Sequence, residues 1–143
     1  AAEALGEMYL HGKEVPQNTT EAFMWLKRAY TPRAENLLGG LFEKEETVNQ
    51  DPLLALDHYE NALRAVTDDT EPQEAIHAHL RIAALTTGDD ATAMQTRKEH
   101  YRAAILLGDD SSIEKLSALG ESTDAINALL QERQTDHKKI ASE

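Results

Sequence analysis

The chain contains no cysteine among its 143 residues, so it forms no disulfide, has no thiol nucleophile and offers no cysteine ligand to zinc. Aromatic residues are few, with four tyrosines, two phenylalanines and one tryptophan. A core must therefore be assembled from many alanine and leucine contacts, and these residues favour helices. The longest apolar run, residues 103–107, is too short to cross a membrane, and we expect no direct membrane insertion.

Positive charge is also scarce. Lysine and arginine number 14 against 26 acidic residues, which gives a net charge of -12. This excess of negative charge opposes binding to phosphate backbones and to anionic lipid. We therefore expect no nucleic-acid partner.

Short polar breaks divide the chain into about eight helical stretches. Residues that cap helices or start them stand before the expected helices at Asn18, Thr31, Asp51, Thr70 and Ser111. Glycines that can adopt the left-handed conformation stand where helices should end, at Gly88, Gly108 and Gly120. The pattern predicts an all-α fold. The chain opens directly on a helical stretch with no targeting segment before it, and we expect it to be a mature chain or part of a longer repeat protein.

A shift of 33 residues aligns the first part of the chain with itself. It pairs identical residues, with Ala1, Leu5, Gly6, Val15, Gln17, Ala22 and Ala29 matching Ala34, Leu38, Gly39, Val48, Gln50, Ala55 and Ala62. This indicates an internal helix-loop-helix repeat. A fainter third copy follows at a shift of 42, where His58-Tyr59 recurs as His100-Tyr101.

Small residues recur at fixed positions of this repeat. Gly6 and Gly39 lack bulk, which lets two antiparallel helices approach closely, and we expect Gly39-Gly40 to be a helix-packing pair. One helix pair cannot bury its apolar stripe alone, so neighbouring pairs must stack. The result is an α-solenoid with a concave surface of the kind that binds other proteins.

The first copy also resembles a known family. It reads Ala1-x3-Leu5-Gly6-x-Met8-Tyr9-x2-Gly12-x2-Val15-x2-Asn18-x3-Ala22-x2-Trp25-x3-Ala29, which is similar to a Sel1-like repeat, a relative of the tetratricopeptide repeat. In the second copy Glu45 replaces the loop glycine and His58 replaces the tryptophan. The resemblance implies a right-handed α-solenoid of antiparallel helix pairs. We expect one domain over residues 1–143, with about four pairs near 1–30, 31–66, 71–107 and 111–141.

Proteins of this family commonly serve as bacterial scaffolds or adaptors in secretion, envelope and signalling assemblies. The resemblance thus implies a non-enzymatic interaction module whose partner is another protein or peptide, in the bacterial periplasm or cytoplasm. An alternative within this class is a periplasmic scaffold of an exopolysaccharide-secretion or envelope complex. An alternative from another class is a helical hydrolase domain that uses paired carboxylates.

In tetratricopeptide-like arrays the first helix of each pair lines the concave side. The resemblance therefore implies a binding groove along the polar edge of these helices. Its expected residues are Glu3, Glu7, His11, Asn36, Lys44, His77 and Arg81. The alternative is a merely solvated face.

Catalytic and metal-binding patterns are missing from the sequence. His77 and His79 lie about 200° apart on a helix, so they cannot chelate one ion together. No Gly-x-Ser-x-Gly elbow or glycine-rich phosphate loop occurs. The paired aspartates at 68–69, 89–90 and 109–110 stand at helix breaks, where carboxylates cap. We therefore expect no catalytic residue, cofactor or metal.

Overall fold

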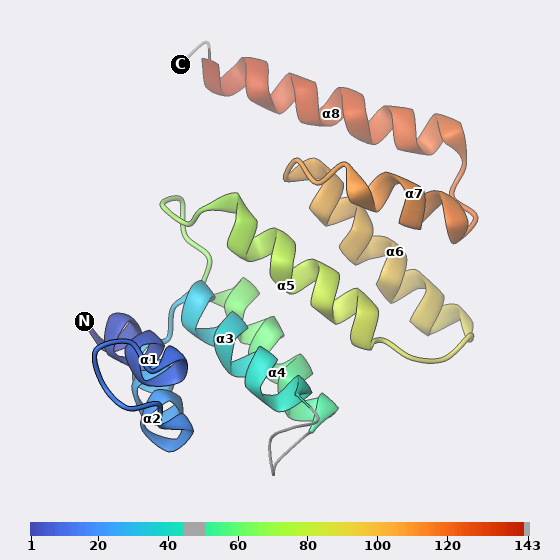
Figure 1. Cartoon of the computed structure of the whole chain (residues 1–143). Helices are drawn as coiled ribbons and strands as arrows, with labels where there is room; N and C mark the ends of the chain where they lie inside the picture. Colours follow the sequence, from blue (N-terminus) through green and yellow to red (C-terminus); the bar gives the residue numbers. More distant parts are fainter. Residues whose placement is uncertain (45–50, 142–143) are drawn as a thin grey trace. The chain divides into compact units, whose positions relative to one another are not determined.

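The computed structural model describes residues 1–44 and 51–141, and the side chains as far as residue 136. The described residues form eight helices and no strand (Figure 1). The helices are α1 (Ala2–His11), α2 (Thr19–Ala29), α3 (Pro32–Glu43), α4 (Pro52–Arg64), α5 (Pro72–Leu85), α6 (Ala91–Leu106), α7 (Ser111–Ala118) and α8 (Thr123–Ala141). The all-α fold is confirmed.

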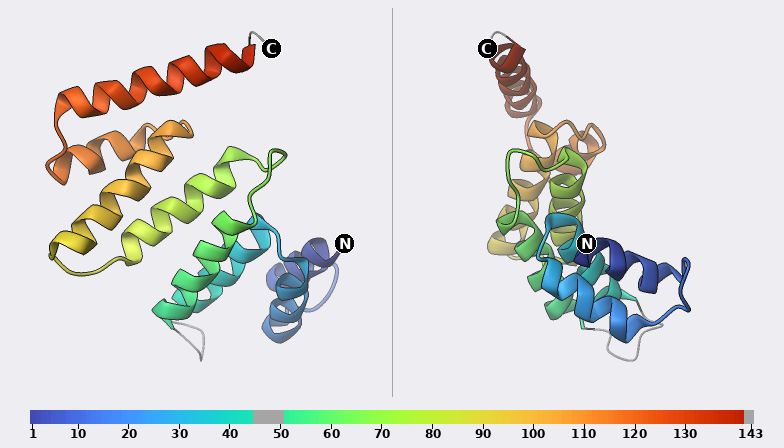
Figure 2. Two further views of the ribbon diagram at one scale, coloured as in Figure 1. Left: turned by 180° about the vertical axis from the view of Figure 1, so that it is seen from behind. Right: turned by 90° about the vertical axis from the view of Figure 1, so that its left-hand side faces the viewer.

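The chain divides into two compact units, Ala1–Ala78 and His79–Glu143. Within the first unit, α1 packs against α2, α3 packs against α4, and α2 also contacts α3 (Figures 1 and 2). Within the second unit, α6 packs against α7 and α8. The helices of each unit therefore pair with their neighbours in the chain, as in an α-solenoid.

Most helix starts follow the expected caps. The side chains of Asn18, Thr31 and Asp51 accept hydrogen bonds from the backbone amides of Glu21, Ala34 and Leu53 respectively, each at 3.1 Å. After α5, α6 and α7, the glycines at 88, 108 and 120 have φ angles of 99°, 113° and 93°, in the left-handed region. These start and stop predictions are confirmed.

One predicted start is wrong in detail. The Thr70 hydroxyl accepts from the amide of Thr67 at 2.9 Å, and α5 begins only at Pro72. A turn at residues 67–70 therefore uses the side chain that was expected to cap α5. The predicted start at Ser111 is confirmed, because Ser111 is the first residue of α7; its hydroxyl donates to the carboxylate of Asp109.

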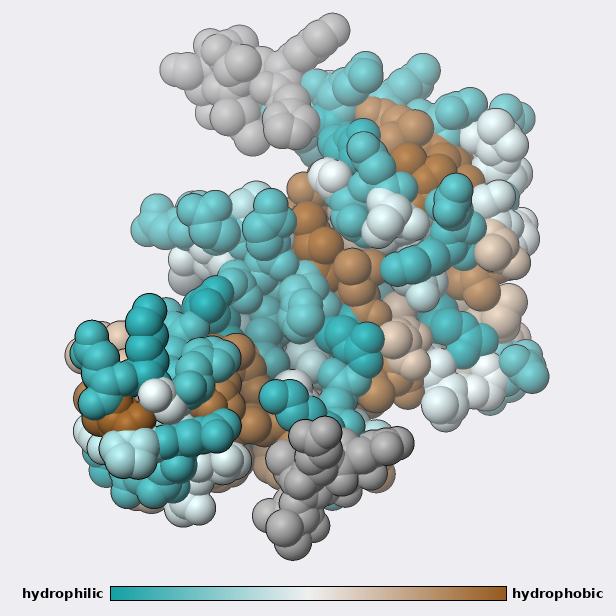
Figure 3. All heavy atoms as spheres, viewed as in Figure 1, coloured by the Kyte–Doolittle hydropathy of each residue, from teal (hydrophilic) through white to brown (hydrophobic). Residues whose placement is uncertain are grey.

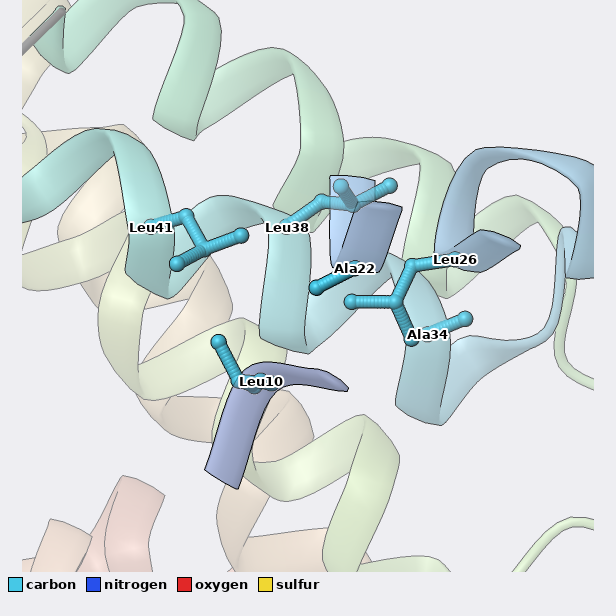
Figure 4. Packing of buried hydrophobic residues seen from close by; sticks show 6 residues of the cluster. All are labelled: Leu10, Ala22, Leu26, Ala34, Leu38 and Leu41. Carbon is cyan, nitrogen blue, oxygen red and sulfur yellow. The ribbon is translucent and has the colours of Figure 1, made fainter. Parts of the chain in front are cut away.

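One hydrophobic cluster of the first unit is made by α1, α2 and α3 (Figure 4). Its buried members are Leu10, Ala22, Leu26, Ala34, Leu38 and Leu41. Three of these are identical positions of the repeat, because Ala22, Ala34 and Leu38 are paired with Ala55, Ala1 and Leu5. The paired positions Val48 and Gln50, and Glu45, lie outside the described residues.

The two repeated glycines allow close approach of helices, as expected. A Cβ atom on Gly6 would lie 2.6 Å from Cγ of Leu26, and one on Gly39 would lie 2.7 Å from Cε1 of Tyr59. Real Cβ atoms do not approach carbon so closely. Gly40 does not share this role, so the expectation of a Gly39-Gly40 packing pair is wrong for Gly40. A Cβ on Gly40 would meet only the Tyr59 hydroxyl, at 3.9 Å.

The second unit has a smaller core of Ile105, Leu116 and Ile126, one residue from each of α6, α7 and α8. Arg133 of α8 donates to the carbonyl of Ile105 at 3.1 Å and to the carboxylate of Asp110 at 3.0 Å. This arginine thus ties α8 to the connection between α6 and α7.

Two histidines meet in the second unit. Nδ1 of His79 on α5 lies 2.8 Å from Nδ1 of His100 on α6, so the N–H of one ring donates a hydrogen bond to the nitrogen of the other. Burial, and then the neighbouring His100, lower the pKa of His79 to about 4. The pair is therefore stable while His79 is neutral.

This pair predicts a loss of stability in acid. An unfolded histidine takes up a proton near pH 6.5 and the folded His79 only near pH 4, so stability falls as the pH drops between these values. Because solvent screens part of the effect, we expect a loss of about 2 kcal/mol. Urea unfolding from pH 7.5 to pH 4 measures it. His79→Gln should remove the loss and His11→Gln, at an exposed site, should not; an unchanged pH profile in His79→Gln contradicts the prediction.

Candidate protein-binding groove of the first unit

An open groove of about 310 Å³ lies between α3 and the first turns of α5. Its described lining consists of Arg33, Asn36 and Leu37 from α3 and Gln73, Glu74 and His77 from α5. On each helix the lining residues are spaced by three or four positions, so they share one face. The groove is thus lined by one face of each helix.

Asn36 joins the two helices across the floor of this groove. Only 5% of the residue is exposed. Its Nδ2 donates to the backbone carbonyl of Glu74 at 2.9 Å and to Oε2 of Glu74 at 3.0 Å. Its Oδ1 is also buried but has no hydrogen-bond partner. An acceptor in this state is uncommon in folded proteins.

Arg33 lies at the edge of the groove between two carboxylates. It donates through Nε and Nη2 to Oε1 of Glu7, at 2.9 and 2.6 Å, and through Nη1 to Oε1 of Glu74 at 3.3 Å. The hydrogen bond to Glu7 is the largest cause that raises the pKa of Arg33. One guanidinium therefore links α1, α3 and α5.

A second polar contact lies between α3 and α4. Oε2 of the buried Glu35 lies 2.7 Å from Nδ1 of His58, whose ring stacks on Phe42 with 5.3 Å between centroids. The next residue, Tyr59, donates its hydroxyl to Glu43 and meets the ring of His77 edge-on. These contacts hold α3, α4 and α5 together behind the groove residues.

The structure brings some of the expected site residues together. Asn36 and His77 line the groove, and Glu7 reaches it through Arg33. Glu3 accepts a hydrogen bond from the hydroxyl of Thr31, just before α3. Glu3 and Glu7 therefore connect α1 to the start of α3.

The other expected residues are placed differently. His11 is exposed at the last residue of α1, and Lys44 is exposed at the residue after α3. Arg81 belongs to the second unit and is not one of the lining residues.

Four lining residues were not predicted: Arg33, Leu37, Gln73 and Glu74. The site was taken from equivalent positions of the repeat, and a shift of 33 residues pairs Arg33 with Val66, which is not polar. A shift of 42 pairs Gln73 and Glu74 with Thr31 and Pro32, which differ in chemistry. The spacing of Gln73 and His77, four positions apart on one helix face, was a usable signal.

The described residues offer little to metal or acid–base chemistry. They contain no group of three or more histidine or carboxylate side chains that could hold a metal ion. The two carboxylates nearest the groove, on Glu7 and Glu74, both bind the permanently charged guanidinium of Arg33. Within residues 1–44 and 51–141, no helix has the length and apolar character that a membrane crossing requires. On the face seen in Figure 3, hydrophobic residues lie in patches among hydrophilic ones.

Helix pairs that pack against their neighbours in the chain define an α-solenoid of the tetratricopeptide-like class. The Sel1 repeat matches residues 1–31 and 32–65, so this part of the chain consists of two Sel1-like repeats. A Sel1 repeat protein from Oxalobacter formigenes has a similar crystal structure, with a TM-score of 0.61 and 27% sequence identity. The similarity covers 82% of this chain and 86% of that one. No curated protein matches this sequence.

The family gives the chain a general role. Sel1 repeats form protein-interaction modules, and proteins built from them are in general not enzymes. The chain is therefore a repeat-based interaction module.

Proposed function

We propose that this chain is a non-enzymatic scaffold or adaptor that holds a partner protein or peptide in the α3–α5 groove. The observation that carries the proposal is the groove itself, which is open and whose α3 side, with Arg33, Asn36 and Leu37, belongs to a Sel1-like repeat. Asn36 and His77 contact the partner from its lining. Glu3 and Glu7 keep α1 and α3 in place beside it.

The proposal also includes His11 and Lys44 of the first unit and, separately, Arg81 of the second unit as partner-binding residues. Each is a polar side chain on a first helix of a pair or next to its end. The negative charge of the chain argues for a protein partner over a nucleic acid. A place in a periplasmic exopolysaccharide-secretion or envelope complex is one form that this function could take.

The hydrolase alternative has weaker support. Paired carboxylates act as acid and base when one of them can hold a proton for the substrate. Here Glu7 and Glu74 share an arginine instead, in an ion-pair network that joins three helices. Hydrolytic turnover that disappears in Glu74→Gln would favour the enzyme.

A bulky side chain placed in the groove should prevent the partner from binding. Gln73→Trp places a bulky ring in the lining at an exposed residue, and Asp57→Trp places the same ring at an exposed site on α4, away from the lining. We expect Gln73→Trp to reduce partner capture by about tenfold, a change of about 1.4 kcal/mol, and Asp57→Trp to leave it unchanged. The measurement is cross-linked affinity capture from cells of the source organism, quantified by mass spectrometry. Capture of the same proteins by both variants would place the interface elsewhere.

A further inference from the structure

The unpaired acceptor of Asn36 points to the chemistry of the occupant. The orientation of this amide is fixed, because turning it over would set its oxygen against the carbonyl and carboxylate of Glu74. Oδ1 is therefore the atom left without a donor, in a residue that lines the groove. A buried acceptor of this kind destabilises the free protein until a donor reaches it.

The charges around the groove favour an occupant with a net positive charge. The single guanidinium of Arg33 faces two carboxylates, those of Glu7 and Glu74, so this cluster keeps a net negative charge. The surrounding unit, residues 1–78, has 15 acidic and 6 basic residues. A negative field of this kind attracts cationic segments and repels acidic ones.

We propose that the α3–α5 groove binds an extended basic segment of a partner protein, and that an N–H group of this segment donates to Oδ1 of Asn36. Lysine or arginine side chains of the segment face the carboxylates of Glu7 and Glu74. The volume of about 310 Å³ suits a short stretch of peptide. This inference rests on the proposed function, since it names the partner of the same groove.

The test begins with a phage library of random 12-residue peptides selected on the full chain. The recovered peptides should carry a net positive charge. The strongest binder is then labelled with fluorescein, and its affinity is measured by anisotropy at 50 and 300 mM NaCl. We expect binding to weaken at the higher salt concentration.

Variants separate the acceptor from the charge. Asn36→Leu should weaken peptide binding at least tenfold. It also leaves the carbonyl and carboxylate of Glu74 without their donor, so the melting temperature should fall, and affinities are compared at a temperature where the variant is folded. Glu74→Gln should weaken peptide binding several-fold. The matched control Glu60→Gln, on α4 and outside the lining, should have no effect.

The wild-type chain supplies a measurement that needs no variant. In a nitrogen-15 spectrum, the side-chain amide signals of Asn36 should shift when the peptide is added. An empty selection, peptides of neutral or negative charge, or unshifted Asn36 signals would each overturn the inference. The proposed function fails separately, when Gln73→Trp leaves partner capture unchanged.

Discussion

Replacing Leu38 with alanine should lower the free energy of unfolding of the first unit by about 2–5 kcal/mol. Leu38 has no exposed surface and packs among Leu10, Leu26 and Leu41. Removal of its side chain leaves a cavity between α2 and α3 that the fixed helices cannot close. Urea unfolding, followed by the fluorescence of Trp25, reports on this unit, because Trp25 is the only tryptophan and lies in α2.

Leu53 provides the control for this change. It is 75% exposed in the first turn of α4, so Leu53→Ala should change stability by less than about 0.5 kcal/mol. Equal losses in the two variants would mean that Leu38 is not a core residue and that the repeat register is misplaced.

Two neighbouring glycines should respond to alanine with opposite signs. At Gly39 the added Cβ would overlap the ring of Tyr59, which is buried and cannot move aside, so Gly39→Ala should destabilise the first unit by about 3 kcal/mol. At Gly40 the new methyl group has ordinary contacts. Alanine also favours the helix over glycine, so Gly40→Ala should stabilise by up to about 1 kcal/mol.

The same unfolding measurement decides between these outcomes. A loss at both positions would indicate that α4 lies over Gly40 as well, and a gain at both would indicate that the two helices are farther apart than the structure shows. The pair is informative because the two substitutions are identical in chemistry and adjacent in the chain.

Local chemistry predicted most of the fold. Caps and left-handed glycines act within a few residues, and the repeat marks Leu38 and Gly39 as packing sites by comparison with Leu5 and Gly6. The error at Thr70 has a local cause too. Its hydroxyl accepts from the amide of Thr67 within a turn instead of from an amide of α5, and the sequence alone does not rank these two donors.

Contacts between distant residues were harder to predict. Glu35 and His58 are 23 positions apart, and the family pattern has a tryptophan where this chain has His58, so the pattern offers no partner for it. Arg33 and Glu74 are 41 positions apart and meet only when α5 docks on α3. Asn36 was predicted as a site residue, but its unpaired oxygen depends on where that docking places Glu74.

The guanidinium of Arg33, which Glu7 and Glu74 share, couples binding of the proposed basic segment to the packing of α5 on α3. Arg33 is 51% exposed, so its bond to Glu74 is open to exchange with a cation from outside. A lysine that takes over Glu74 leaves Arg33 to Glu7 alone, and α3 then loses one of its ties to α5. Linkage is reciprocal. A change that strengthens the Arg33–Glu74 contact between α3 and α5 must therefore lower the affinity for the lysine by the same factor. In the proposed complex, occupation of the groove and the packing of α5 on α3 are therefore coupled.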